Sequence, residues 1–407
     1  MNDPVLFLQQ LIRAQPDGEA AVQACVADAA KALGCTVETV RYRPGDVPMV
    51  GEFAARRAMV AGERASVVAT FKGQGADKGK GRSLIFFAHP DGEPLAGTEA
   101  WQRDPFGGVI DNGRVHGWGV ADDLSGVAMM VEGLATVLAS GRRPAGDVII
   151  ASTPSKRHAR GVSALLHGGL RADAAVYCHP AESGEGMREI KAFCLGQLDF
   201  RITVRGTPPP TSEISHLAFA HQANNPADTL AALHRRLKEF ADRRAAALSH
   251  PLLDRAANIL ISHVSVGAEG VHTRVPSEGA MEGSLSLLPG EDMAAVQAAV
   301  EQVATGGRLE WISGISGAEV ALDGPLYRTV ADAIVSVTGE KPHVNPLHTA
   351  SDIRNPIVQA GIPTIGLGPL GGDLTQNGCH DEWVDVEDYR RAVKVAAAII
   401  SGWCGIV

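Results

Sequence analysis

The sequence has few aromatic residues and no run of basic residues. Phe, Trp and Tyr make up 5% of the 407 residues, and Asp and Glu outnumber Lys and Arg by 46 to 37, giving a net charge of −9. Nucleic-acid binding needs clustered cations, so we expect no nucleic-acid partner. Gly and Pro, by contrast, number 46 and 23, which favours a loop-rich α/β enzyme over a helical bundle.

Long hydrophobic runs and paired cysteines are also missing. The longest apolar run, residues 392–407, is too short to span a bilayer and contains Lys394, so we expect no membrane contact. The six cysteines are scattered without a CxxC pair, as is typical of reduced thiols. The N-terminal segment has no basic region followed by a cleavage site, so we expect no secretory signal. These features together predict a cytoplasmic protein.

Hydrophobic patterning predicts an α/β domain that is split by an inserted α+β domain. Continuous apolar runs at 65–71, 83–88, 147–152, 174–178 and 363–367 are typical of strands in a mostly parallel sheet. Helices are predicted at 3–34, 123–138, 161–170 and 325–338, and from 387. Between them, alternating runs at 198–204, 257–266 and 280–288 predict antiparallel strands, with helices from 225 and over 289–303. We expect a split catalytic domain at 1–195 and 317–407 and an inserted domain at 196–316.

Residues that commonly bind metals stand at the predicted strand ends. His89 follows an apolar strand with Asp91 two residues later, Asp122 opens a helix, His179 ends another strand, and His380 precedes the last helix. A parallel sheet presents its functional groups at such ends. Each stretch alone also fits an ordinary loop histidine or, for Asp122, a helix N-cap. Taken together, the four stretches favour a metal site.

The same motifs resemble those of the M20 metallopeptidases and amidohydrolases, which include acetylornithine deacetylase, succinyl-diaminopimelate desuccinylase and carboxypeptidase G2. The likeness covers nearly the whole chain. The matching segments are His89-Pro90-Asp91, Trp101 with Asp104-Pro105-Phe106, the GWGVAD segment ending at Asp122, SDIR at 351–354, and GIPT at 361–364. The resemblance implies a zinc-peptidase-like catalytic domain and an inserted lid or dimerisation domain, and hence a homodimer.

The resemblance also implies roles for individual residues. His89, Asp122 and His179 would hold one cation, and Asp122 would bridge to a second site that uses His380. Asp91 would orient His89.

In the inserted domain, residues 215–226 resemble the family segment whose His polarises the substrate carbonyl. We expect His216 in that role, with His221 as the second choice, and Asn225 at the substrate. Arg354 would hold a substrate carboxylate, although a structural salt bridge fits it nearly as well.

The sequence departs from the family at the Glu-Glu pair that supplies a general base and a ligand of the second metal. Counting back from Gly161, these positions hold Ser155 and Lys156. An ammonium beside a dication is unfavourable in a low-dielectric site. In the lid, Ser286 also replaces an expected Arg. We therefore expect one divalent cation per chain, Zn²⁺, Mn²⁺ or Co²⁺, and we expect Lys156 to pair with Asp122 or with the developing oxyanion.

The general base has to come from another residue. Candidates are Asp123, Glu182, Glu382 and His158, and we favour Glu182, three residues beyond His179. The sequence thus predicts a metal-dependent hydrolase that cleaves a linear, amide-type C–N bond in a small carboxylate-bearing substrate. Two alternatives stay open: a hydrolytic deaminase of a non-peptide, aromatic amino acid-like substrate, and a catalytically inactive binding protein with the M20 fold.

Overall fold

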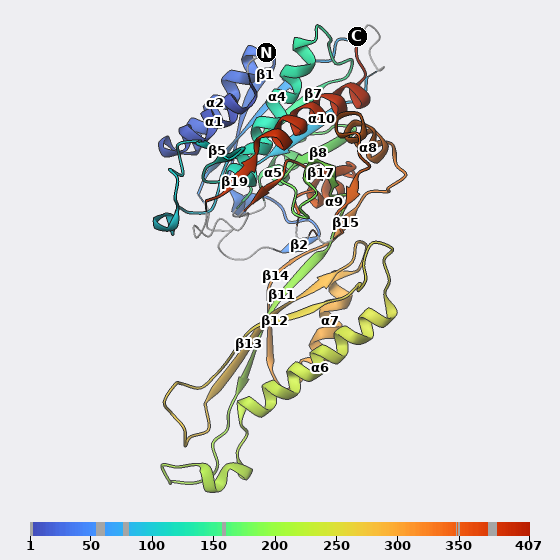
Figure 1. The fold of residues 1–407 in the computed structure, drawn as a ribbon. Helices are drawn as coiled ribbons and strands as arrows, with labels where there is room; N and C mark the ends of the chain where they lie inside the picture. Colours follow the sequence, from blue (N-terminus) through green and yellow to red (C-terminus); the bar gives the residue numbers. More distant parts are fainter. Residues whose placement is uncertain are drawn as a thin grey trace. The chain divides into compact units, whose positions relative to one another are not determined.

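The chain divides into two compact units. The computed structural model describes residues 3–53, 62–75, 81–156, 160–346, 348, 351–372 and 381–407. Of these, the first unit contains the residues up to 50, those of 62–193, and Glu319–Val407 (Figure 1). The second unit contains Cys194–Ala318 and residues 51–53. Strand β2 (Glu52–Phe53) therefore belongs to the second unit, although the sequence-based boundaries leave it in the first.

A six-stranded sheet forms the centre of the first unit. Its order is β1 (Thr36–Tyr42), β3 (Arg64–Phe71), β7 (Val148–Ser152), β4 (Leu84–Ala88), β8 (Ala174–Cys178) and β17 (Thr364–Leu367). The last four strands pair in parallel, whereas β3 is antiparallel to both of its neighbours. Strands β4, β7 and β8 are buried at every position, as continuous apolar runs require. The predicted mostly parallel α/β fold is confirmed.

Five helices share one hydrophobic core with this sheet (Figure 1). They are α1 (Val5–Ala14), α2 (Glu19–Ala32), α4 (Ser125–Ala139), α8 (Pro325–Thr338) and α10 (Val386–Cys404). Phe86 and Val176 face this core, and the alternate residues Phe87 and Tyr177 stack on each other 4.9 Å apart. Helices α5 (Gly161–His167) and α9 (Arg354–Ala360) contact each other. No helix in the described part of the chain has the length and apolar character to cross a membrane.

Short strands complete the first unit. Strands β18 (Gly371–Gly372), β19 (Trp383–Asp385), β6 (Arg114–His116) and β5 (Ile110–Asp111) form a small sheet in that order. Strand β16 (His343–Val344) pairs in parallel with β9 (Glu189–Ile190). Strands β10 (Phe193–Cys194) and β15 (Ala318–Glu319) lie where the chain passes between the units.

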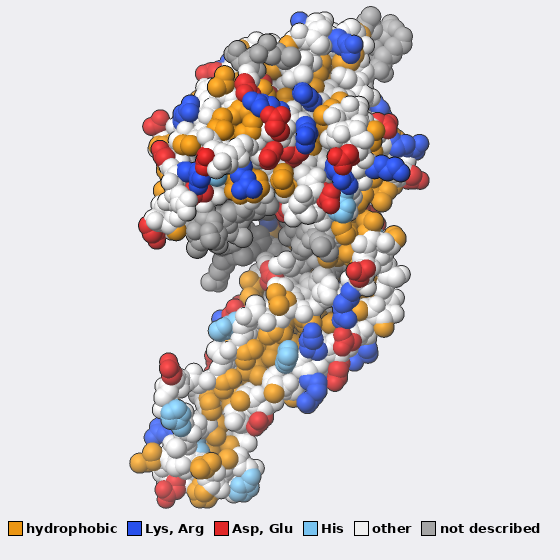
Figure 2. Space-filling view, viewed as in Figure 1, with side chains coloured by type: hydrophobic (Ala, Val, Ile, Leu, Met, Phe, Trp, Pro, Cys, Tyr) orange, Lys and Arg blue, Asp and Glu red, His pale blue; other side chains and the backbone are white. Residues whose placement is uncertain are grey.

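The second unit is an antiparallel sheet packed against two helices. The strand order is β12 (Ile259–Val266), β13 (Glu278–Leu287), β11 (Gly196–Arg205), β14 (Arg308–Ile315) and β2. Helices α6 (Pro226–Ala247) and α7 (Met293–Val303) share its core. Hydrophobic side chains also appear on the surface of this unit (Figure 2). In the edge strand β12, Leu260 is 65% exposed and Val264 is 54% exposed.

Candidate functional site

A polar cavity lies at the carboxyl ends of the parallel strands in the first unit. It encloses about 220 Å³ and is lined by His89, Asp122, Ser155, Lys156, Tyr177, His179, Glu182, His348, Ser351 and Asp352. His89 follows β4, Ser155 and Lys156 follow β7, and His179 follows β8. Because neighbouring parallel strands end at the same edge of the sheet, side chains from distant parts of the sequence meet there. Asp122 comes from η4 (Val120–Leu124), the turn that precedes α4.

Two imidazoles in this cavity face one oxygen of Asp122. Nε2 of His89 lies 2.9 Å from Asp122 Oδ1, and Nε2 of His179 lies 3.6 Å from the same oxygen. The opposite ring nitrogens face main-chain carbonyl oxygens, with His89 Nδ1 2.9 Å from that of Asp91 and His179 Nδ1 3.3 Å from that of Pro180. Main-chain carbonyls thus orient both rings and leave each Nε2 directed at the cavity.

The carboxylate of Asp91 makes different contacts from those expected. It lies 3.8 Å from His89 Nδ1, and the backbone N–H of Ser155 donates to it at 2.8 Å. The hydrogen-bond partner of His89 Nδ1 is therefore the main-chain carbonyl of Asp91, while the Asp91 carboxylate acts on His89 only through its charge and holds the loop that follows β7.

Burial and opposite charges perturb the pKa values of these groups. Burial alone would lower the pKa of His89, but the carboxylates of Asp122, Asp123 and Asp91 raise it to about 10. Burial lowers the pKa of His179 to about 3, because the attraction of Asp122 does not compensate for lost hydration. Burial would raise the pKa of Asp122, but His89, His179 and Lys156 lower it. His179 is thus neutral at pH 7, the state in which an imidazole binds a metal.

Lys156 and Ser155, which the resemblance places where the family has two glutamates, both hydrogen-bond to carboxylates of the cavity. The ammonium of Lys156 donates to Asp122 Oδ2, and the hydroxyl of Ser155 donates to Asp352 Oδ2. Asp122 therefore carries an ammonium on one oxygen and faces the two imidazoles with the other. This is the first of the two pairings that the sequence predicted for Lys156.

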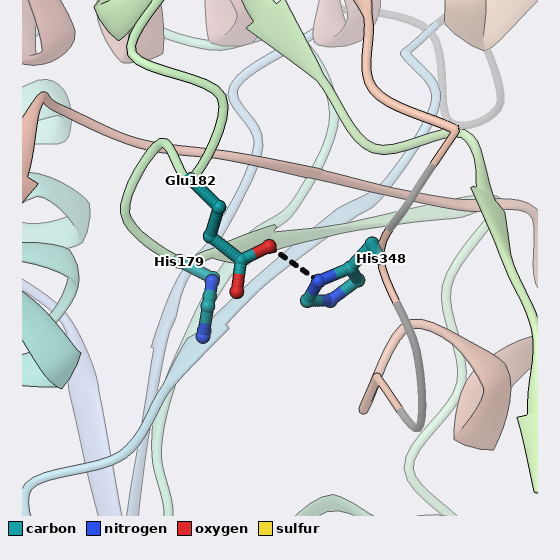
Figure 3. A group of neighbouring side chains, drawn as sticks. All are labelled: His179, Glu182 and His348. Atoms are coloured by element: carbon teal, nitrogen blue, oxygen red, sulfur yellow. Dashed lines mark hydrogen bonds and ion pairs between the residues drawn. The ribbon is translucent and has the colours of Figure 1, made fainter. Parts of the chain in front are cut away.

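Glu182 and His348 form a second pair on the cavity wall. His348 Nδ1 lies 2.5 Å from Glu182 Oε2, and the His348 and His179 rings are 5.3 Å apart between centroids. Figure 3 shows Glu182 lying between the two rings with its carboxylate directed at His348. Burial would raise the pKa of Glu182, but the hydrogen bond from His348 lowers it to about 2, so Glu182 is ionised at neutral pH.

Sequence reasoning missed His348. It lies three residues before the SDIR stretch and outside every strand and helix of the structure, so no local pattern distinguishes it from the other 13 histidines of the chain. Only the fold brings it beside a residue that follows β8.

The other candidates for a general base are less accessible or lie outside the described residues. Asp123 and Glu382 are each 1% exposed. Asp123 accepts the backbone N–H of His89 at 3.2 Å. Glu382 accepts the backbone N–H groups of Gly119, Ala121 and Asp122 at 2.7, 2.8 and 3.1 Å, and burial raises its pKa to about 8. His158 lies outside the described residues.

Several predicted residues are not among the described residues that line the cavity. Arg354 is 2% exposed and donates to the Asn355 side chain at 2.6 Å and to the Val50 carbonyl at 3.1 Å, so its guanidinium is engaged inside the first unit. In the second unit, Asn225 caps the N-terminus of α6. His216 Nδ1 accepts the backbone N–H of Val275 at 3.1 Å. His380, the predicted ligand of a second metal, lies outside the described residues.

The donor set of the cavity fits a divalent cation. Imidazole nitrogens and carboxylate oxygens suit Zn²⁺, Mn²⁺ and Co²⁺. His179, Glu182 and His348 bring one ligand-type atom each to within 4.8 Å of one another. Nε2 of His348 is also buried and has no hydrogen-bond partner among the described residues. A buried acceptor without a partner needs an explanation, and a cation bound in the cavity would provide one.

Comparison with known proteins supports the same class. The family model described as peptidase family M20/M25/M40 matches residues 85–402. The succinyl-diaminopimelate desuccinylase of Rhodospirillum centenum is 26% identical over 336 residues, covering 80% of this chain and 82% of the relative. That of Gluconobacter oxydans is 24% identical and covers 99% of this chain and 98% of the relative.

Solved structures show the same fold along almost the whole chain. An M20 family metallo-carboxypeptidase from Sulfolobus solfataricus matches with a TM-score of 0.71 at 13% identity, covering 99% of both chains. A dinuclear metal-binding peptidase of the M20 family from Bacillus subtilis matches with a TM-score of 0.61 at 15% identity, covering 97% of this chain and 98% of the other.

The family match decides between the functions that the sequence left open. A peptidase family hydrolyses C–N bonds, so the predicted metallohydrolase class is confirmed, and the comparisons support neither a deaminase nor an inactive binding protein. The match spans well over half of the chain. The chain therefore belongs to peptidase family M20/M25/M40.

Proposed function

We propose that this protein hydrolyses an amide-type C–N bond of a small carboxylate-bearing substrate, with one divalent cation held by His89, Asp122 and His179. The main support is that the two imidazole Nε2 atoms lie 2.9 and 3.6 Å from the same carboxylate oxygen. Ligand atoms bonded tetrahedrally to one cation at about 2.1 Å are about 3.4 Å apart. The spacing of each imidazole nitrogen from the Asp122 oxygen is close to that value.

The residues around this position fit a hydrolytic mechanism. A divalent cation at such a site acidifies water and polarises a substrate carbonyl. The side chain of Glu182 is 30% exposed and ionised, and it is our choice for accepting the proton of the attacking water. Lys156 brings a positive charge to the cavity wall, which favours negative charge that develops on the carbonyl oxygen.

We propose N-acyl amino acids, including N-succinyl compounds, as the substrate class. The curated relatives are named succinyl-diaminopimelate desuccinylases, and a small cavity of about 220 Å³ fits one end of such a molecule. From the second unit we retain His216 as the residue that polarises the substrate carbonyl and Asn225 as a substrate contact. Arg354 stays a weaker candidate for a substrate carboxylate, because its guanidinium is buried against Asn355 and Val50.

The cation, the assembly and the compartment also belong to the proposal. We propose Zn²⁺, Mn²⁺ or Co²⁺ at one ion per chain, since Lys156 takes the position of a metal ligand. We propose a homodimer formed through the second unit, whose edge strand β12 exposes Leu260 and Val264. A cytoplasmic location is supported by Cys25, Cys35, Cys178, Cys194 and Cys404, which are all free thiols.

Metal analysis combined with a hydrolysis screen tests this function. The protein, purified without chelator, should contain close to one divalent cation per chain and release amino acid from N-succinyl or N-acyl substrates. His89→Ala should lose cation and turnover together, whereas His343→Ala, on β16, should keep both. Unchanged turnover in the His89 variant, or ammonia as the product in place of an amino acid, would contradict the proposal.

A further inference from the structure

We propose that His348 is a further ligand of the divalent cation, binding it through Nε2 while Glu182 holds its Nδ1–H. This inference rests on the proposed function, because it concerns the same cation. It assigns a residue that neither the sequence motifs nor the predicted ligand set includes. The argument starts from the two nitrogens of the His348 ring.

The two ring nitrogens of His348 have unlike surroundings. Nδ1 lies 2.5 Å from Glu182 Oε2, and a carboxylate so close fixes the hydrogen on Nδ1. In the neutral ring Nε2 is then an acceptor with a lone pair. His348 is 7% exposed, and its Nε2 is buried without a hydrogen-bond partner among the described residues. Leaving a buried acceptor unsatisfied is unfavourable, and a cation at Nε2 would satisfy it.

A carboxylate that accepts a hydrogen bond from one histidine nitrogen while the other nitrogen binds metal is a frequent arrangement in metalloproteins. Here it occurs beside a proposed metal ligand. One ligand-type atom from each of His179, Glu182 and His348 lies within 4.8 Å of the others. Figure 3 shows the His179 and His348 side chains on either side of the Glu182 carboxylate.

The segment that carries Glu182 and the segment that carries His348 both donate hydrogen bonds to the buried carboxylate of Glu189. The backbone N–H groups of Glu182 and Ser183 donate to Glu189 at 3.0 and 2.6 Å, and the ammonium of Lys191 lies 2.7 Å from the same carboxylate. The side-chain amide of Asn345, three residues before His348, donates to Glu189 at 3.3 Å. The position of His348 relative to Glu182 is therefore fixed in advance of binding, as a ligand position requires.

This assignment also explains how the site tolerates Lys156. The ammonium on Asp122 Oδ2 occupies a place where a carboxylate ligand would otherwise be expected. His348 would supply an imidazole nitrogen from the side of the cavity where Glu182 and His179 lie, so the cation would regain a ligand.

Cobalt binding by the full-length, metal-free protein tests the proposal independently of activity. Wild type, His348→Ala, His348→Gln, Glu182→Gln and the control His343→Ala would each be titrated with Co²⁺, and X-ray absorption would count the imidazole ligands. We expect both His348 variants to bind Co²⁺ at least tenfold more weakly with one imidazole fewer, Glu182→Gln to bind about 10–100-fold more weakly, and the control to match wild type. Thermal melting of each metal-free variant shows that it is folded.

The outcomes separate this inference from the proposed function. Wild-type affinity and imidazole count in a folded His348 variant would overturn the role of His348 and leave the proposed function standing. Failure of the wild-type protein to bind Co²⁺ or any other divalent cation would overturn both.

Discussion

At the scale of single residues, we propose that the charge of Lys156 limits the number of cations that the site binds. Lys156→Glu replaces an ammonium with a carboxylate beside Asp122, so we expect a second cation to bind and the metal content to rise from about one per chain to about two. Lys156→Gln removes the charge without adding an anionic ligand, and its metal content should stay near one. Elemental analysis after equilibration with Zn²⁺ measures both. Equal metal content in the two variants would show that Lys156 does not restrict the site.

The Glu182–His348 pair makes stability depend on pH in the acid range. The hydrogen bond from His348 lowers the pKa of Glu182 from 4.5 to about 2, so its contribution is complete above about pH 5 and is lost as the pH falls toward 2. Because solvent screens the partly exposed carboxylate, the metal-free wild type should lose only about 1 kcal/mol of unfolding free energy more than Glu182→Gln between pH 6 and pH 3. Urea unfolding at the two pH values measures the difference. An equal loss in both proteins would rule out this pair as its source.

Sequence could identify some members of the site and not others, for a physical reason. His89 and His179 follow continuous apolar runs, so their place at the sheet edge follows from the pattern of the strands before them. His348 lies in no element, and only long-range packing brings it to Glu182. The engagement of Arg354 with Asn355 and Val50 was equally inaccessible, because one of these contacts joins residues 304 positions apart.

At the scale of elements, Glu382 holds the turn that presents Asp122. The backbone N–H groups of Gly119, Ala121 and Asp122, at and just before η4, donate to its carboxylate. Glu382→Ala should lower the unfolding free energy by about 2 kcal/mol, because buried N–H groups lose their acceptor, and it should weaken cation binding as well. Glu387→Ala on the surface of α10 is the control and should change neither. Thermal melting and Zn²⁺ titration measure the effects, and wild-type behaviour of the Glu382 variant would refute this role.

The strands that were predicted best are those with continuous apolar runs. Strands β4, β7, β8 and β17 coincide with predicted runs to within a residue at each end, since burial on both faces selects an unbroken series of apolar side chains. Strands β1, β2 and β14 were missed. β1 carries polar residues on a partly exposed edge, and the two-residue β2 joins the second unit only by pairing with β14. Strand β2 belongs to the second unit only through this pairing, which joins residues far apart in the sequence.

At the scale of the whole molecule, we propose that the edge strand β12 is the surface through which two chains associate. Leu260→Lys places a charge where we propose that two chains meet, and an unpaired charge in an interface is costly. We expect the dimer to dissociate at protein concentrations at least about tenfold above those for wild type. Leu6→Lys changes an exposed leucine of α1 in the first unit and should leave assembly unchanged. Sedimentation velocity measures both variants, and a dimer of wild-type strength in the Leu260 variant would place the contact elsewhere.

The ion pair between Lys156 and Asp122 has a consequence for the protein when metal is scarce. A chelator can remove a bound cation from the cavity, but the ammonium of Lys156 stays beside Asp122 because it is part of the chain. Without the proposed cation, Lys156 still compensates part of the charge of Asp122, and the lowered pKa of Asp122 keeps its carboxylate ionised. We therefore expect the metal-free protein to bind the proposed cation without a rearrangement of Asp122.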